Sequence, residues 1–157
     1  MLTVEEYRSG FLSYLESFKS PTNPKNLYEP VSYILGLKGK RIRPILTLLT
    51  CDIFNDNHKS ALDAALAVEV FHNFSLVHDD IMDEDDLRHN VATIHKKWDN
   101  AHAVLSGDGL GALGPLYIGK IKKNTLAILI RYNEVILEIC EGPVSYTHLT
   151  LPTTCCV

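Results

Sequence analysis

The chain has 157 residues, of which 46% are hydrophobic and 22% charged, and its formal net charge is −4. This composition fits one globular domain with a buried core and argues against a general nucleic-acid binder. We expect a cytoplasmic protein, because we find no membrane-length apolar run, no signal-peptide pattern and no metal-ligand spacing among Cys51, Cys140, Cys155 and Cys156.

Helical periodicity runs through almost the whole chain before Pro143, and no strand alternation interrupts it. The spacing of apolar residues predicts a first helix over residues 4–18. Thr3 and Glu6 have the spacing of a capping box at its start.

Prolines divide the next part of the chain. Pro21 and Pro24 predict a loop, followed by a short helix over about residues 27–35 that ends in a turn at 36–39. Pro44 suits the first position of the next helix, which has a broad apolar face.

The longest helix is predicted from a cap at Ser60 to about Asp86. Residues 61–77 are apolar nearly all round, as in a helix buried at the centre of a domain.

Residues 88–90 break this pattern, and another helix is predicted from about Asn100. The glycines between residues 107 and 119 disfavour helix, and Pro115 favours a kink. A phosphate-binding loop is the weaker interpretation, because no strand precedes the glycines, so we expect a kinked, closely packed helix. A final helix is predicted over about residues 126–140.

The run from His78 to Arg88 is the most informative stretch, since six of the eight residues from Asp79 to Asp86 are acidic. In a continuous helix, each like-charge pair at i,i+3 or i,i+4 would cost roughly 0.2–0.5 kcal/mol, which indicates a bound cation. Asp79 and Asp83 lie one turn apart. Proteins usually hold Mg²⁺ with one or two carboxylates, water and substrate phosphates.

Basic and histidine side chains accompany the acidic run. Lys40 and Arg43 lie at a helix start, where backbone N–H groups also favour anions. His72 precedes Asp79 by two helical turns, and Arg88 follows the acids. Each has a plain alternative: a solvated basic face, an interior histidine, or a partner for a nearby acid. Together they describe a site for diphosphates with Mg²⁺.

This combination resembles the trans-type polyprenyl diphosphate synthases from about Leu27 to Gly142. The matching motifs are GKRIRP at 39–44, HNFSLVHDDIMD at 72–83, DLR at 86–88, TIHKKW at 93–98, LSGD at 105–108 and LEICEG at 137–142. The resemblance implies an all-α fold: part of an isoprenoid-synthase-type helical bundle whose central buried helix carries the aspartate-rich motif.

The resemblance also implies roles for the site residues. Asp79 and Asp83 would ligate Mg²⁺ on an allylic diphosphate that Arg88 also contacts, so these three residues form the expected catalytic set. The residues expected to hold isopentenyl diphosphate are Lys40, Arg43, His72 and the residue at position 89.

The implied reaction, part of isoprenoid biosynthesis, joins isopentenyl diphosphate to an allylic diphosphate. The allylic C–O bond ionises, the isopentenyl double bond attacks the cation, and a proton is lost. Phe74, five residues before Asp79, lies about 7.5 Å along the helix and would close the product cavity. It would then favour farnesyl or geranylgeranyl chains, although it could instead be a core residue.

Some features depart from the family pattern. His89 stands where the family usually has a second arginine for isopentenyl diphosphate, and Lys38 replaces a glycine. A neutral histidine cannot form a guanidinium fork, so weaker binding of that substrate is expected. The second aspartate-rich motif is absent. The family also suggests a homodimer for a full-length protein.

The last segment, residues 143–157, has no acidic residue, lysine or arginine, and it resembles a translated sequencing adapter. We therefore expect residues 1–142 to be the N-terminal part of a synthase domain and residues 143–157 to be foreign to it. Such a fragment is expected to be poorly active or inactive alone.

Two alternatives remain open. The chain could be a non-catalytic subunit that binds diphosphate or regulates a partner. The doublet His78-Asp79 could also belong to a metal-dependent phosphohydrolase, but no further histidines stand at convincing spacing.

Overall fold

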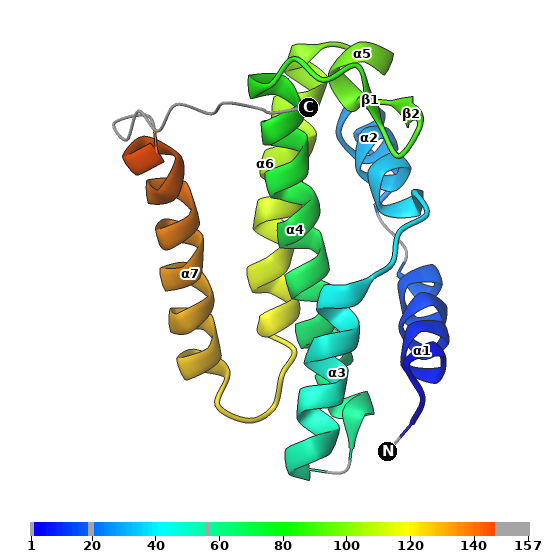
Figure 1. Cartoon of the computed structure of the whole chain (residues 1–157), viewed down its shortest axis with the longest axis vertical. Coiled ribbons are helices and arrows are strands. Elements are labelled where there is room, and N and C mark those ends of the chain that lie inside the picture. Colours follow the sequence, from blue (N-terminus) through cyan, green and yellow to red (C-terminus); the bar gives the residue numbers. More distant parts are fainter. Residues whose placement is uncertain (1, 19–20, 56, 147–157) are drawn as a thin grey trace, which may run out of the picture. The chain divides into compact units, whose positions relative to one another are not determined.

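The computed structural model describes residues 2–18, 21–55 and 57–146, which fall into two compact units, one ending at Lys122 and one beginning at Lys123. The described residues are helical apart from loops and one two-stranded hairpin, so the all-α prediction is confirmed (Figure 1). The elements are α1 (Val4–Ser17), α2 (Lys25–Gly36), α3 (Ile42–Asn55), the 3-10 helix η1 (His58–Ala61), α4 (Leu62–Met82), β1 (Leu87–Arg88), β2 (Val91–Ala92), α5 (Ile94–Lys97), α6 (Asn100–Ile118) and α7 (Thr125–Tyr146).

The start of α1 confirms the predicted capping box. The Thr3 backbone N–H donates to Glu6 Oε2 at 2.7 Å, and the Glu6 N–H donates to Thr3 Oγ1 at 3.3 Å. These bonds satisfy backbone donors that have no acceptor within the helix.

Helix α3 begins earlier than predicted. Its first residue is Ile42, so Pro44 is the third helical residue rather than the first. A proline is tolerated there because N–H groups in the first turn have no intrahelical acceptor.

Helix α4 lies at the centre of the first unit and packs against α3 and α6 (Figure 1). The predicted central buried helix is thereby confirmed. Both of its predicted ends are wrong. Ser60 belongs to η1, where its hydroxyl donates to the Asn57 carbonyl at 2.8 Å, and α4 ends at Met82 rather than near Asp86. Asp83 caps the helix, its N–H donating to the Asp79 carbonyl at 2.8 Å.

Glycines let α4 and α6 approach closely. A Cβ on Gly107 would lie 2.4 Å from the His78 ring, and one on Gly111 would lie 3.2 Å from the Phe74 ring. Helix α6 runs through the glycine-rich stretch and past Pro115, so the predicted helix with close packing at these glycines is confirmed. The expected kink stays a prediction.

The hairpin of β1 and β2 was not predicted, although the break at residues 88–90 is confirmed. Its turn residues His89 and Asn90 have φ values of 53° and 64°, as in a type I′ turn. The Tyr33 hydroxyl of α2 donates to the Ala92 carbonyl at 2.8 Å, which attaches the hairpin to that helix.

The second unit consists of α7 in the described part of the chain. This helix continues past Pro143 to Tyr146, so the expected end near Cys140 is wrong. The rest of the segment expected to be foreign, residues 147–157, lies outside the described residues. Among the described residues, no helix has both the length and the apolar character needed to cross a membrane.

Candidate functional site

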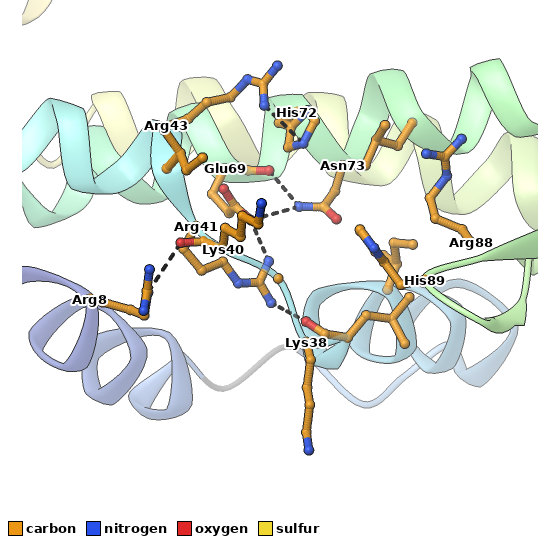
Figure 2. Close-up of a pocket in the computed structure, with 15 residues that line it drawn as sticks. Arg8, Lys38, Lys40, Arg41, Arg43, Glu69, His72, Asn73, Arg88 and His89 are labelled. Carbon is orange, nitrogen blue, oxygen red and sulfur yellow. Dashed lines mark hydrogen bonds and ion pairs between the residues drawn. The ribbon is translucent and has the colours of Figure 1, made fainter. Parts of the chain in front are cut away.

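A cavity of about 680 Å³ opens between the α2–α3 loop, the start of α3, the middle of α4 and the hairpin (Figure 2). Its lining includes all five polar residues expected to hold diphosphates: Lys40, Arg43, His72, Arg88 and His89. The structure therefore brings together residues from three separate segments of the chain.

The two cations expected to hold isopentenyl diphosphate, Lys40 and Arg43, are not neutralised in the described part of the chain. Among the described residues, no carboxylate lies within ion-pair distance of Lys40 or Arg43. The neighbouring Lys38 also lines the cavity, but its ammonium group points away from the other labelled groups (Figure 2). Unpaired cations in a cavity favour an anionic ligand.

His72 lies beside one of these cations. Arg43 Nη1 is 3.3 Å from His72 Nε2, so a neutral His72 can accept this bond. Burial, and then the charge of Arg43, hold the pKa of His72 below its usual value. His72 is accordingly neutral near pH 7.

The residue Arg41, between these cations, was not predicted as part of the site. Its guanidinium is buried and forms an ion pair with Glu69 of α4, next to Asn73 (Figure 2). The sequence signal was Glu69 itself, an acidic residue inside an apolar helix, which requires a buried partner.

Arg88 is anchored by an acidic residue to which the sequence analysis gave no role. Arg88 Nε donates to Asp80 Oδ1 at 2.6 Å, and Asp80 is only 2% exposed. Asp85 lies 3.6 Å from Nη2. Bonding to Asp80 raises the pKa of Arg88, which keeps the guanidinium charged beside the cavity.

The acidic run divides into paired and unpaired carboxylates. Asp80 and Asp85 face Arg88, and Asp86 faces Lys96 at 2.9 Å. Asp79 is half-buried and Asp83 exposed, and within the described residues neither forms an ion pair.

These two unpaired carboxylates suit Mg²⁺ in its usual protein setting. They lie one helical turn apart and leave coordination positions for water and phosphate oxygens. No group of three or more histidine, cysteine, aspartate or glutamate side chains in the described part of the chain could hold a metal alone. A cation at Asp79 and Asp83 would therefore need oxygen ligands from elsewhere, such as a diphosphate.

Asp79 and Asp83 do not line the cavity. His72, Leu76, Asp79 and Asp83 recur at helical spacing along α4, and His72 and Asp79 are about 10 Å apart along the axis. Helix α4 thus lines the cationic cavity with His72 and, two turns further on, presents two carboxylates that are unpaired among the described residues.

Phe74 also lies apart from the cavity. Its ring packs toward α6, next to Gly111, and stacks on Phe71 with a centroid distance of 5.6 Å. His78, at 4.6 Å, covers another part of the ring. Phe74 belongs to the contact between α4 and α6.

Comparison with known proteins identifies relatives for most of the chain. The family model described as polyprenyl synthetase matches residues 24–148. A geranylgeranyl diphosphate synthase of Methanosarcina mazei is 39% identical over 124 residues, which cover 77% of this chain and 38% of the relative. A geranylgeranyl pyrophosphate synthase of Geoglobus acetivorans is 37% identical over 131 residues, 82% of this chain and 41% of the relative.

Solved structures share the fold. A geranylgeranyl pyrophosphate synthase crystal structure matches with a TM-score of 0.91 at 40% identity, covering 98% of this chain and 48% of that chain. An FPP/GFPP synthase from Zymomonas mobilis matches with a TM-score of 0.78 at 31% identity, covering 96% and 58% respectively. The chain spans about two fifths of the length of the two curated relatives.

Proposed function

The chain belongs to the polyprenyl synthetase family, and from this premise we propose that it supplies the diphosphate-binding part of a prenyltransferase. The reaction would join isopentenyl diphosphate to an allylic diphosphate and give a short-chain product. The observation that carries the proposal is that α4 lines a cavity with cations unpaired among the described residues and, two turns further on, presents a separate pair of unpaired carboxylates.

The cationic cavity suits the diphosphate of isopentenyl diphosphate. Lys40 and Arg43 would bind its oxygens, and His72 could donate a hydrogen bond once protonated beside the anion. His89 would contact the same group more weakly than the arginine that the family usually has there.

The carboxylate pair suits the allylic diphosphate. Asp79 and Asp83 would hold Mg²⁺, which supplies Lewis-acid stabilisation of the departing diphosphate. Arg88, fixed by Asp80, would contact the same leaving group through its remaining N–H groups. Binding both substrates along α4 places the isopentenyl double bond near the allylic carbon, and proximity of this kind lowers the barrier.

The proposal is tested first by binding of inorganic pyrophosphate with and without Mg²⁺. We expect Asp79→Asn and Asp83→Asn each to remove most of the Mg²⁺-dependent gain in affinity, because each takes away one of two carboxylates. Glu84→Gln is the matched control: it removes a neighbouring, exposed negative charge to which no role is given, and it should bind like the unaltered chain. The metal assignment would be refuted if all three variants lost the Mg²⁺-dependent gain in affinity equally, or if none of them lost it.

Turnover is tested with labelled isopentenyl diphosphate and allylic primers in a full-length version of the enzyme. We expect the same Asp79 and Asp83 changes to abolish chain elongation. Binding of both diphosphates without any elongation would instead identify a non-catalytic binding subunit.

A separate proposal concerns the length of the prenyl product. We propose that the Phe74 ring, wedged against Gly111, limits the space for a growing chain between α4 and α6. Phe74→Ala in a full-length version should therefore lengthen the product. Phe11→Ala, which removes a buried ring in α1, is the control for general loosening. An unchanged product distribution would leave Phe74 as a packing residue only.

A further inference from the structure

One buried residue, Arg41, joins three helices at the cavity through its side chain and its backbone carbonyl. Arg41 Nη2 donates to the carbonyls of Leu35 at 2.8 Å and Leu37 at 2.6 Å, and Nη1 donates to Glu69. Leu35 lies in the last turn of α2, whose final carbonyls lack helical donors. The Arg41 carbonyl accepts the Ile45 N–H at 3.2 Å at the start of α3. The residue therefore connects the end of α2, the start of α3 and the middle of α4.

The partner of Arg41 is itself fixed. Glu69 is 3% exposed and Asn73 is 4% exposed. Asn73 Nδ2 donates to the Glu69 carbonyl at 2.8 Å and lies 3.4 Å from Glu69 Oε1. A buried ion pair with further hydrogen bonds has little freedom to shift, since each lost contact leaves a charge unsatisfied.

The backbone at Arg41 has an unusual conformation. Its φ of 52° is left-handed, which an L-residue with a long side chain rarely adopts unless its surroundings hold it there. Lys40 directly precedes this residue, and Arg43 follows two positions later. A second contact holds the same loop, because Arg8 Nε donates to the Lys40 carbonyl at 3.3 Å.

We propose that Arg41 is a positioning residue of the cavity: paired with Glu69, it fixes the backbone that presents Lys40 and Arg43 to a diphosphate. The inference rests on the proposed function of the cavity. The charge of Arg41 is cancelled by Glu69, so its contribution is the geometry of the loop rather than attraction of the anion.

Charge and geometry give opposite expectations for one substitution. Glu69→Gln removes a negative charge from the cavity wall, so attraction alone would make pyrophosphate bind more tightly. If Arg41 positions the loop, the same change frees its guanidinium and binding becomes weaker. The sign of the effect therefore separates the two explanations.

The experiment measures pyrophosphate affinity by calorimetry and backbone exchange by hydrogen–deuterium mass spectrometry on the 157-residue chain. We expect Glu69→Gln to bind about tenfold more weakly, equivalent to roughly one charge-assisted hydrogen bond. Arg41→Lys, which keeps the charge but loses the fork, should show a similar loss and covers the case that Glu69→Gln does not fold. Exchange should accelerate in the peptide covering residues 37–41 and stay unchanged in α6.

Two controls and two tests of the cavity accompany these variants. Tyr14→Phe removes the 2.7 Å bond to Asp63 outside the cavity lining and reports the effect of lower stability alone. Lys59→Gln removes an exposed cation of η1 outside the cavity lining, so its affinity should change little. Lys40→Gln and Arg43→Gln test the cavity itself and should each weaken binding.

The outcomes separate the inference from its premise. If Lys40→Gln and Arg43→Gln weaken binding while folded Glu69→Gln and Arg41→Lys bind as tightly as the unaltered chain, the positioning role is wrong and the proposed function stands. Tighter pyrophosphate binding by Glu69→Gln would also overturn the positioning role. If Lys40→Gln and Arg43→Gln bind normally, the proposed function of the cavity itself fails.

Discussion

Position 89 combines a position at the cavity with an unusual backbone. His89 lines the cavity, and its φ of 53° places it in the left-handed part of a two-residue turn. Histidine, asparagine and aspartate adopt this conformation more readily than most residues. The hairpin therefore accommodates His89 well, while the cavity would gain from a further guanidinium at this position.

We expect His89→Arg to lower the Kd for isopentenyl diphosphate by about tenfold, because a guanidinium can form two charge-assisted hydrogen bonds where neutral imidazole offers one weaker bond. Calorimetric titration of the 157-residue chain checks this. His89→Gln, neutral and without a fork, is the control and should not tighten binding. An arginine variant that folds and binds no better would contradict the assignment of position 89.

The basic residues between α2 and α4 show how much of the site could be predicted from single residues. Lys40, Arg41 and Arg43 are alike in the sequence, and charge at a helix start indicated an anion site. Which of them turns inward depends on Glu69, 28 residues further along the chain. No local pattern could identify Arg41 as the buried one. The role of Asp80 was hidden for a similar reason, since its partner Arg88 comes from a hairpin that the sequence did not predict.

At the scale of elements, the close packing of α4 against α6 depends on glycines, which have no side chain. Gly107 faces the His78 ring and Gly111 faces the Phe74 ring. A helix normally loses about 1 kcal/mol per glycine relative to alanine, so these positions exchange helix propensity for close approach.

We expect Gly107→Ala to lower the free energy of unfolding by about 1–3 kcal/mol, since its Cβ would lie 2.4 Å from the His78 ring, which would have to leave its present packing. Gly10→Ala is the matched control. Gly10 lies inside α1 with no atom within 4 Å of an added Cβ, so alanine should stabilise the chain by about 0.5–1 kcal/mol. Urea denaturation measures both, and two changes of the same sign would contradict this explanation.

Element boundaries were harder to predict than elements. Apolar periodicity predicted α1, and an all-round apolar stretch predicted α4. The helix through the glycines was expected because no strand precedes them, which disfavours a phosphate-binding loop. It could not predict that α4 stops at Met82, because long-range contacts hold the chain beyond that point. The Thr93 hydroxyl donates to the Asp85 carbonyl at 2.8 Å, and the Thr93 N–H donates to the Asp86 carbonyl at 3.1 Å. The acidic residues thus avoid the repulsion that a continuous helix would impose.

At the scale of the whole molecule, His72 makes stability depend on pH. Its pKa in the folded chain lies below the ordinary value of 6.5, through burial and the charge of Arg43. Between these two pKa values the unfolded chain binds more protons than the folded chain. The stability associated with neutral His72 is therefore present above pH 6.5 and is lost as the pH falls through the lowered pKa.

We expect the unaltered chain to lose stability relative to His72→Gln as the pH falls below about 6.5. Urea denaturation of both proteins across this range gives the difference, in which the titration of other groups cancels. In an Arg43→Gln background the difference should shrink, because one cause of the lowered pKa is gone. Parallel curves for the unaltered chain and His72→Gln would contradict the expected titration.

The attachment of the hairpin to α2 gives the molecule a built-in optical reporter. Trp98, the single tryptophan of the chain, lies edge-on to Tyr33 at 5.3 Å, and the Lys97 ammonium is 4.8 Å from its ring. Tyr33 is the residue that holds the strand next to Arg88 and His89. Any movement of the hairpin on anion binding would alter the surroundings of the indole, so tryptophan fluorescence can report it without any added dye.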